Sequence, residues 1–126
     1  MICAVNELSP SVIILQETKL KKSGMIKTLK GYQIFEKIRK HKCGGGLLVA
    51  VENNLNPVLV DNDESVELLI VEINLPVGKA HIINGYGPQE HDLLENKLSF
   101  WQRFEDAVTR AKESECMIIS QMGEII

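Results

Sequence analysis

The sequence lacks the features that mark secreted, zinc-binding and membrane-spanning proteins. It contains three cysteines, Cys3, Cys43 and Cys116, with no Cys-x-x-Cys pair. An odd number of widely spaced cysteines predicts free thiols in a reducing compartment and gives no indication of a zinc site. No stretch approaches the roughly 18 apolar residues of a membrane span, and the N-terminus has no signal-peptide pattern. We therefore expect an intracellular protein, cytoplasmic or nuclear, with no membrane partner.

The sequence also lacks an overall positive charge. A formal net charge of −3 argues against a strongly basic surface that would coat nucleic acid. The charges are unevenly distributed, however, because acidic residues concentrate at 61–72 and 90–115. A local basic stripe can still bind nucleic acid, and basic residues crowd one part of the N-terminal third: Lys19, Lys21, Lys22, Lys27, Lys30, Lys37, Arg39, Lys40 and Lys42.

What the sequence does contain is an ordinary globular composition. Its 126 residues, 44% hydrophobic and 25% charged, suffice for one domain with one core and are too few for two. The segment from Leu68 to Gln89 organises the chain, because two segments rich in Val, Ile and Leu flank a turn at 76–79. Pro fixes φ and Gly tolerates positive φ, so the pattern predicts an antiparallel hairpin. Its second strand leads into Tyr86, whose hydroxyl we expect at a sheet end, where binding sites form.

Further strands and one long helix are predicted around this hairpin. Apolar runs predict strands at 12–15, 32–38, 47–51, 58–60 and 117–119. Residues 1–8 have the spacing of the end of a helix, so we expect a strand upstream of them. The strongest helical pattern covers 92–113. Its apolar stripe, in which Trp101 is expected to belong to the core, comprises Leu94, Leu98, Trp101, Phe104 or Glu105, Val108 and Ala111.

Two residues at strand ends are candidates for chemistry. Glu17 follows the buried strand 12–15, and a carboxylate fixed there suits a hard cation such as Mg²⁺, although composition alone favours a solvated strand-end residue. Tyr86 could orient a phosphate in a cleft or be a half-buried aromatic at a sheet edge. Gly44–Gly46 precedes a strand rather than a helix, which favours a tight bend over a phosphate-binding loop. The three histidines show no ligand spacing, and His81 is expected to be a packed or edge residue.

Several short segments, taken in order, resemble the endonuclease/exonuclease/phosphatase superfamily. More narrowly, they are similar to the apurinic-endonuclease-like domain of non-LTR retrotransposons. Each segment is only moderately specific, whereas the ordered set spans nearly the whole chain. The matching segments are Val12–Thr18, Gly44–Ala50, Leu69–Ile73, Ile82–Pro88 and the helix with Phe100-Trp101 that precedes Met117–Ile119.

The resemblance implies a Mg²⁺-dependent phosphodiesterase that acts on DNA. Its fold would be a four-layered, DNase I-like α/β sandwich. In this family the strand-end Glu, here Glu17, holds the metal that polarises the scissile phosphate. The Tyr of the family's Tyr-x-Pro segment, here Tyr86, contacts the phosphate. The family often has Asn after that Pro, where this chain has Gln89, which can still donate a hydrogen bond.

The chain departs from the family at its catalytic Asp and Asn. The family's late strand is followed by Gly-Asp-x-Asn, and Gln121 and Gly123 stand in the places of that Asp and Asn. A neutral amide cannot accept a proton as a carboxylate does, and glycine offers no side chain. The family's first strand and C-terminal half, with its Asp-His pair, are not matched. We therefore expect an inactive endonuclease domain with at most weak Mg²⁺ binding, or alternatively a catalytically dead remnant that binds nucleic acid or protein.

The matched portion also leads to an expectation about the fold. It should form one mixed, mostly antiparallel sheet with helices on its outer face. The face that meets the second sheet in the family would lack a partner within this chain. The strands 12–15, 47–51 and 117–119 would then expose apolar surface, from which we expect self-association or a protein partner.

Overall fold

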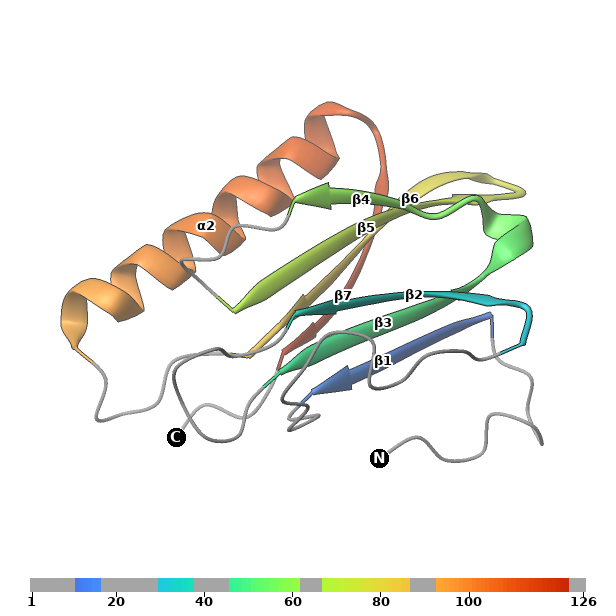
Figure 1. Cartoon of the computed structure of the whole chain (residues 1–126). Helices are drawn as coiled ribbons and strands as arrows, with labels where there is room; N and C mark the ends of the chain where they lie inside the picture. The colour runs from blue at the N-terminus through green and yellow to red at the C-terminus, as the bar shows by residue number, and fades with distance from the viewer. Residues whose placement is uncertain (1–10, 17–29, 38–45, 62–66, 87–92, 123–126) are drawn as a thin grey trace.

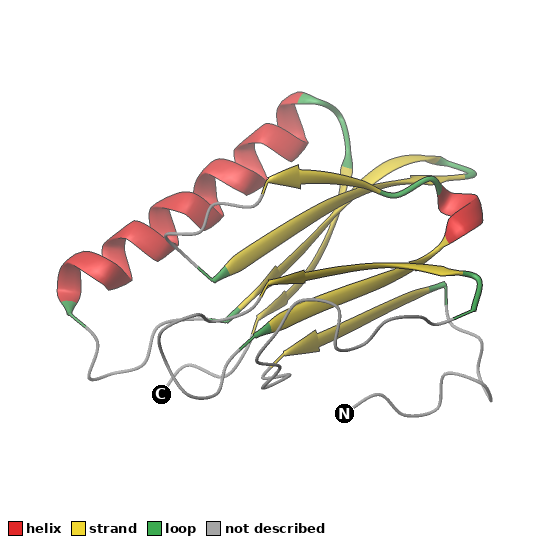
Figure 2. Ribbon diagram, in the orientation of Figure 1, coloured by secondary structure: helices red, strands yellow, loops and turns green. Residues whose placement is uncertain are grey.

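A computed structural model describes residues 11–16, 30–37, 46–61, 67–86 and 93–122. Every strand expected in this part of the chain is present, and so is the helix (Figures 1 and 2). The elements are β1 (Val12–Gln16), β2 (Tyr32–Lys37), β3 (Leu47–Glu52), the short 3-10 helix η1 (Asn53–Leu55), β4 (Val58–Asp61), β5 (Leu68–Leu75), β6 (Gly78–Gly85), α2 (Leu94–Glu113) and β7 (Met117–Met122).

The strands form two sheets, so the expectation of a single sheet is wrong. Sheet A has the order β1-β3-β2 and is antiparallel throughout. Sheet B has the order β4-β5-β6-β7, with a parallel pair only between β6 and β7. Sheet A lies against one face of sheet B, and α2 covers the other face (Figure 1). The described part of the chain is therefore a three-layered α/β arrangement.

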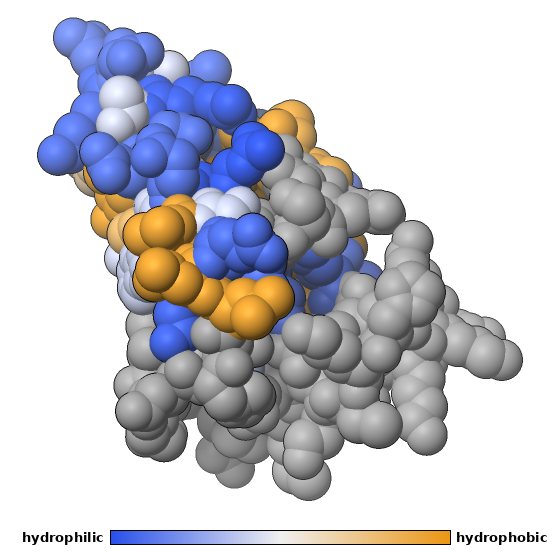
Figure 3. Space-filling view, turned by 90° about the vertical axis from the view of Figure 1, so that its left-hand side faces the viewer, coloured by the Kyte–Doolittle hydropathy of each residue, from blue (hydrophilic) through white to orange (hydrophobic). Residues whose placement is uncertain are grey.

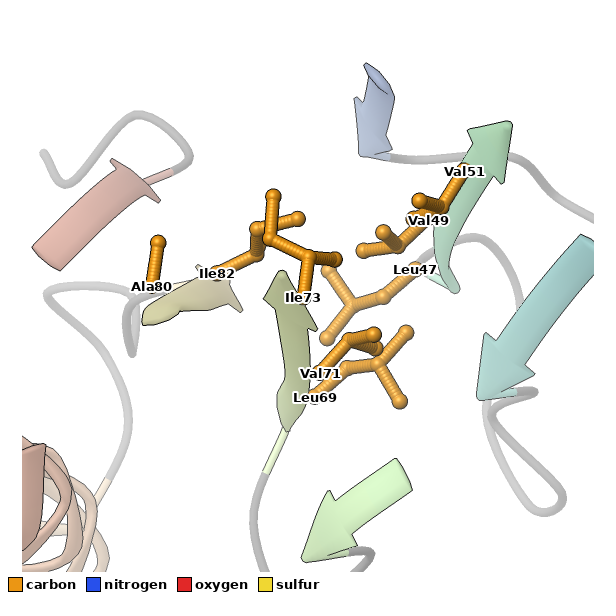
Figure 4. Packing of buried hydrophobic residues seen from close by; sticks show 8 residues of the cluster. All are labelled: Leu47, Val49, Val51, Leu69, Val71, Ile73, Ala80 and Ile82. Carbon is orange, nitrogen blue, oxygen red and sulfur yellow. The ribbon is translucent and has the colours of Figure 1, made fainter. Parts of the chain in front are cut away.

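The core between the sheets fills the face that was expected to lack a partner. In β3, β5 and β6, alternate residues point into this core, as the period of two in a strand requires. Its fully buried members interdigitate in Figure 4: Leu47, Val49, Val51, Leu69, Val71, Ile73, Ala80 and Ile82. Of the three strands predicted to be uncovered, Leu47–Val51 is buried on both faces and Val12–Leu15 is half-buried. Only Met117–Ile119 remains exposed.

The turn of the central hairpin is shorter than predicted. Leu75 pairs directly with Gly78, so only Pro76 and Val77 form the turn, and β6 already includes Gly78 and Lys79. Gly78 has a φ of +142°, a conformation that favours glycine, and this lets β6 begin pairing with β5 directly after the turn. The turn fixes the register of a hairpin. Every cross-strand pair along β5 and β6 therefore differs from the pair that a turn over 76–79 would give.

The helix α2 packs through a stripe that agrees with the predicted one towards its C-terminal end, where Ala111 is buried, and differs from it in the first turns. Phe100, Ala107 and Ala111 are buried against sheet B, whereas Trp101 is 38% exposed. Leu94 and Leu98 are more exposed still, because the first turns of α2 extend beyond the strands (Figure 1). Figure 3 shows an apolar patch among polar residues on the side of the molecule that faces left in Figure 1. Among the described helices, none has the length and apolarity needed to cross a membrane.

The difference between the two stripes can be tested by truncating neighbouring aromatic residues of α2. Phe100→Ala should lower the free energy of unfolding by about 3–4 kcal/mol, because it leaves a cavity between α2 and sheet B. Trp101→Ala should cost only about 1 kcal/mol, since Trp101 contributes edge-to-face contacts with Phe100 and Phe104 from a partly exposed position. Urea denaturation of the two variants measures both values. Equal losses would contradict the observed packing.

Candidate functional site at the carboxyl ends of three strands

The strands β1, β6 and β7 end at the same edge of the molecule. β6 and β7 are parallel, and their last pairs are Asn84 with Gln121 and Gly85 with Met122. β1 belongs to the other sheet, but its last residue, Gln16, reaches β6. The Gln16 Nε2 donates hydrogen bonds to the Gly85 carbonyl at 2.9 Å and to the Asn84 Oδ1 at 3.2 Å. We call this region the carboxyl edge and define it by Gln16, Asn84, Gly85, Tyr86 and Gln121.

Asn84 joins the two sheets at this edge. It is fully buried, and its Nδ2 donates to the carbonyls of Leu15 at 2.9 Å and Leu48 at 3.1 Å. Those carbonyls belong to β1 and β3 of sheet A, while Asn84 lies in β6 of sheet B. Both amide protons are thus used, and the amide oxygen accepts from Gln16. The amides of Gln16 and Asn84 therefore position the carboxyl edge instead of offering free donors to a ligand.

A positive charge lies at the same end of the sheets. Lys37, the last residue of β2, donates from Nζ to the carbonyl of Leu68 in β5 at 3.4 Å. The pairing of Lys37 with Leu47, and of Leu47 with Gln16, places it beside the carboxyl edge. An ammonium group there would favour an anionic ligand such as a phosphate.

The predicted site residues fall into two groups. Glu17, Gln89 and Gly123 lie outside the described residues, although Glu17 directly follows Gln16 in the sequence. Tyr86 and Gln121 lie at the carboxyl edge: Tyr86 directly follows β6, as predicted, and Gln121 lies within β7, which extends beyond the predicted strand 117–119. Tyr86 is half-buried against the core between the sheets, and its backbone N–H donates to the Glu67 carbonyl at 3.1 Å. Gly46, the described residue of the triple glycine, has a φ of +95°, which fits a bend before β3.

Sequence reasoning missed a second group of residues on the opposite face of sheet B. Glu72, His81 and Cys116 each place a potential ligand atom within 4.8 Å of the other two. Glu72 and His81 are a directly opposed pair in the hairpin, and a two-residue turn in the sequence pattern would have revealed it. Cys116 precedes β7, and only the long crossover through α2 brings it to the pair. No local spacing predicts that contact.

No protein-family model matches the chain, and no curated protein matches it significantly.

The role of Asn84 gives a sharp test. Asn84→Asp replaces two donated hydrogen bonds by a carboxylate oxygen that faces two carbonyl oxygens. It should lower the free energy of unfolding by about 3 kcal/mol or more. Asn74→Asp, at an exposed position of β5, is the matched control and should change stability by no more than about 0.5 kcal/mol. Urea titrations at neutral pH compare the two, and similar stabilities would show that the inter-sheet contact is dispensable.

Proposed function

We propose that this chain is an endonuclease-type domain, derived from the Mg²⁺-dependent phosphodiesterases of non-LTR retroelements, that has lost hydrolysis. The observation that carries the proposal is the meeting of three strand ends from two packed sheets at the carboxyl edge. This is where the resemblance would place a metal-binding carboxylate after β1, a tyrosine after β6 and, at the position of Gln121 in β7, the aspartate that activates water. The finer proposal is that the described layers belong to a four-layered sandwich.

The position of Gln121 supports the loss of activity. Its backbone pairs with Asn84, so the residue that would supply the general base lies beside the strand that leads to Tyr86. An amide cannot take a proton from the attacking water, and a positioned general base typically contributes about 10²–10⁴-fold to the rate. Gly123, in place of the phosphate-holding Asn, removes a further group, and groups that act as a unit cannot replace one another.

A plasmid assay tests this proposal. The purified chain with millimolar Mg²⁺ should nick supercoiled DNA no faster than the same sample with a chelator. It should nevertheless bind a fluorescent DNA duplex, with micromolar or weaker affinity that falls steeply with salt, because nine of its 14 basic residues lie between 19 and 42.

Two results would change the conclusion. Nicking that requires Mg²⁺ and disappears in Glu17→Ala would show that hydrolysis is retained. A chain that neither nicks nor binds DNA would contradict the nuclease origin and favour a protein-binding role.

A protein-binding role has its own structural support in β7. This strand forms one edge of sheet B, and Met117, Ile118 and Ile119 are between 36% and 40% exposed. The opposite edge, β4, is shorter and has a register irregularity at Leu59–Asp61. Irregular, short edges resist pairing with another chain, whereas a regular apolar edge promotes it. We therefore propose self-association through β7.

Lysine substitutions on the two edge strands test whether the chain associates through β7 or through β4. Ile119→Lys should convert an associating chain to monomer, because a lysine on an edge strand opposes strand pairing. Leu59→Lys, at a similarly exposed position of β4, should leave association unchanged. Sedimentation velocity over a range of concentrations measures both. A monomeric wild-type chain would refute self-association, and equal effects of the two variants would refute the choice of β7.

A further inference from the structure

Glu72, His81 and Cys116 form a compact group on the helix side of sheet B. Their strand neighbours Ile73, Ala80 and Ile82 point into the core between the sheets, so Glu72 and His81 point to the other face. The group is separate from the carboxyl edge, because it lies on the opposite face and His81 is about 10 Å along β6 from Asn84. Cys116 is held at the start of β7, where its backbone N–H donates to the Ala111 carbonyl at 2.9 Å.

The distances suit a small metal ion. Tetrahedral zinc, with bonds of about 2.0–2.3 Å to nitrogen, oxygen and sulfur, places its ligand atoms about 3.3–3.6 Å apart. The His81 Nε2 and the Glu72 Oε1 are already 3.2 Å apart. No ligand separation in the group exceeds 4.8 Å. Small rotations of the Cys116 and Glu72 side chains would therefore bring all three atoms to bonding distance.

The burial of these side chains leaves a polar group unsatisfied. The His81 side chain is 4% exposed, and its Nδ1 is buried without a hydrogen-bond partner among the described residues. A buried polar atom without a partner is costly and uncommon in native proteins. The thiol of Cys116 is also buried, with a weak contact from Sγ to the Ser114 carbonyl at 3.7 Å. The nitrogen that faces Glu72 is Nε2, so a metal ion would bind there and at the Cys116 thiol, while Nδ1 carries the ring proton.

We propose that Glu72, His81 and Cys116 bind a divalent metal ion of intermediate softness, for which Zn²⁺ is the best fit. Thiolate, imidazole and carboxylate are the three ligand types that zinc accepts, whereas Mg²⁺ requires oxygen ligands. A thiolate and a carboxylate together balance the two positive charges of the ion, so the occupied site carries no net buried charge. Three protein ligands leave one position for water, on the side where Glu72 is 28% exposed.

The same three residue types could also form a nucleophilic thiol with its base. Cys116 is only 9% exposed and His81 is more deeply buried, so a substrate carbonyl could not approach the sulfur. A metal ion needs far less access than a substrate. The geometry therefore favours metal binding over covalent catalysis.

The bound ion would have a structural role. Glu72 lies in β5, His81 in β6 and Cys116 at the start of β7, so one ion would link the hairpin to the strand that follows α2. An ion that binds only the folded state stabilises it, by an amount that grows with the ratio of metal concentration to dissociation constant.

Metal binding by the full chain tests the proposal. The chain, freed of metal with a chelator, should take up one Zn²⁺, measured by competition with a chromophoric chelator and by elemental analysis after dialysis. Co²⁺ in place of Zn²⁺ should give tetrahedral visible absorption and a thiolate charge-transfer band. Bound Zn²⁺ should raise the melting temperature of the chain. Millimolar Mg²⁺ should not displace the bound Zn²⁺.

Three variants locate the ligands. Cys116→Ser should abolish the charge-transfer band and weaken Zn²⁺ binding by more than about 100-fold, because loss of an outer-shell partner alone costs about 10–100-fold. Glu72→Gln, a change of similar size at a partly exposed position, should weaken Zn²⁺ binding while the fold, checked by circular dichroism, is kept. The double variant Cys3→Ser/Cys43→Ser is the control and should retain both the band and the affinity.

The proposal fails if the wild-type chain retains no stoichiometric zinc. It fails equally if Cys116→Ser keeps the thiolate band, or if the control double variant loses it. Neither DNA binding nor nicking enters these readouts, so they are independent of the proposed function.

Discussion

The arrangement of this chain depends on the amide of Asn84. Apolar contact between two sheets has no direction, and it would tolerate many relative positions. The hydrogen bonds from Asn84 to the Leu15 and Leu48 carbonyls have a direction and a length, so they select one position. Because Gln16 joins the same network, the last residues of β1 and β6 meet at a defined place. The strand ends meet at the carboxyl edge because a polar side chain lies inside the core and joins the two sheets.

Much of the fold could be predicted from sequence, because apolar runs and turn residues report on local structure. The strands, the hairpin and α2 were placed within a few residues of their observed bounds. The division into two sheets could not be predicted from the apolar runs. A run such as Leu47–Val51 is buried on both faces whether the strands form one continuous sheet or two packed sheets. The predicted stripe of α2 was wrong in its first turns for a related reason: Phe100 and Trp101 are both apolar neighbours, and only the position of sheet B decides which of them faces inward.

The candidate sites differ in how far the sequence reveals them. Tyr86 and Gln121 were placed at strand ends by their position after apolar runs, and the structure brings these ends together. Glu72 and His81 were missed because the hairpin turn was assigned two residues too many, which shifts every pair. Cys116 joins them through the packing of a long crossover, which no local pattern encodes. Local chemistry can therefore be predicted from sequence where it depends on strand ends, but not where it depends on register between distant elements.

The pairing of β7 has a consequence for how the domain opens. β5 and β6 are hydrogen-bonded along both of their edges, and their connection is two residues long. Among the described strands, β7 is bonded to β6 alone, and it reaches β6 through a connection that includes all of α2. Such an element can detach together with its helix while the hairpin and sheet A stay folded, as a separate cooperative unit. The backbone amide hydrogens of β7 would then exchange with solvent through this partial opening. Those between β5 and β6 would exchange only when the whole domain unfolds.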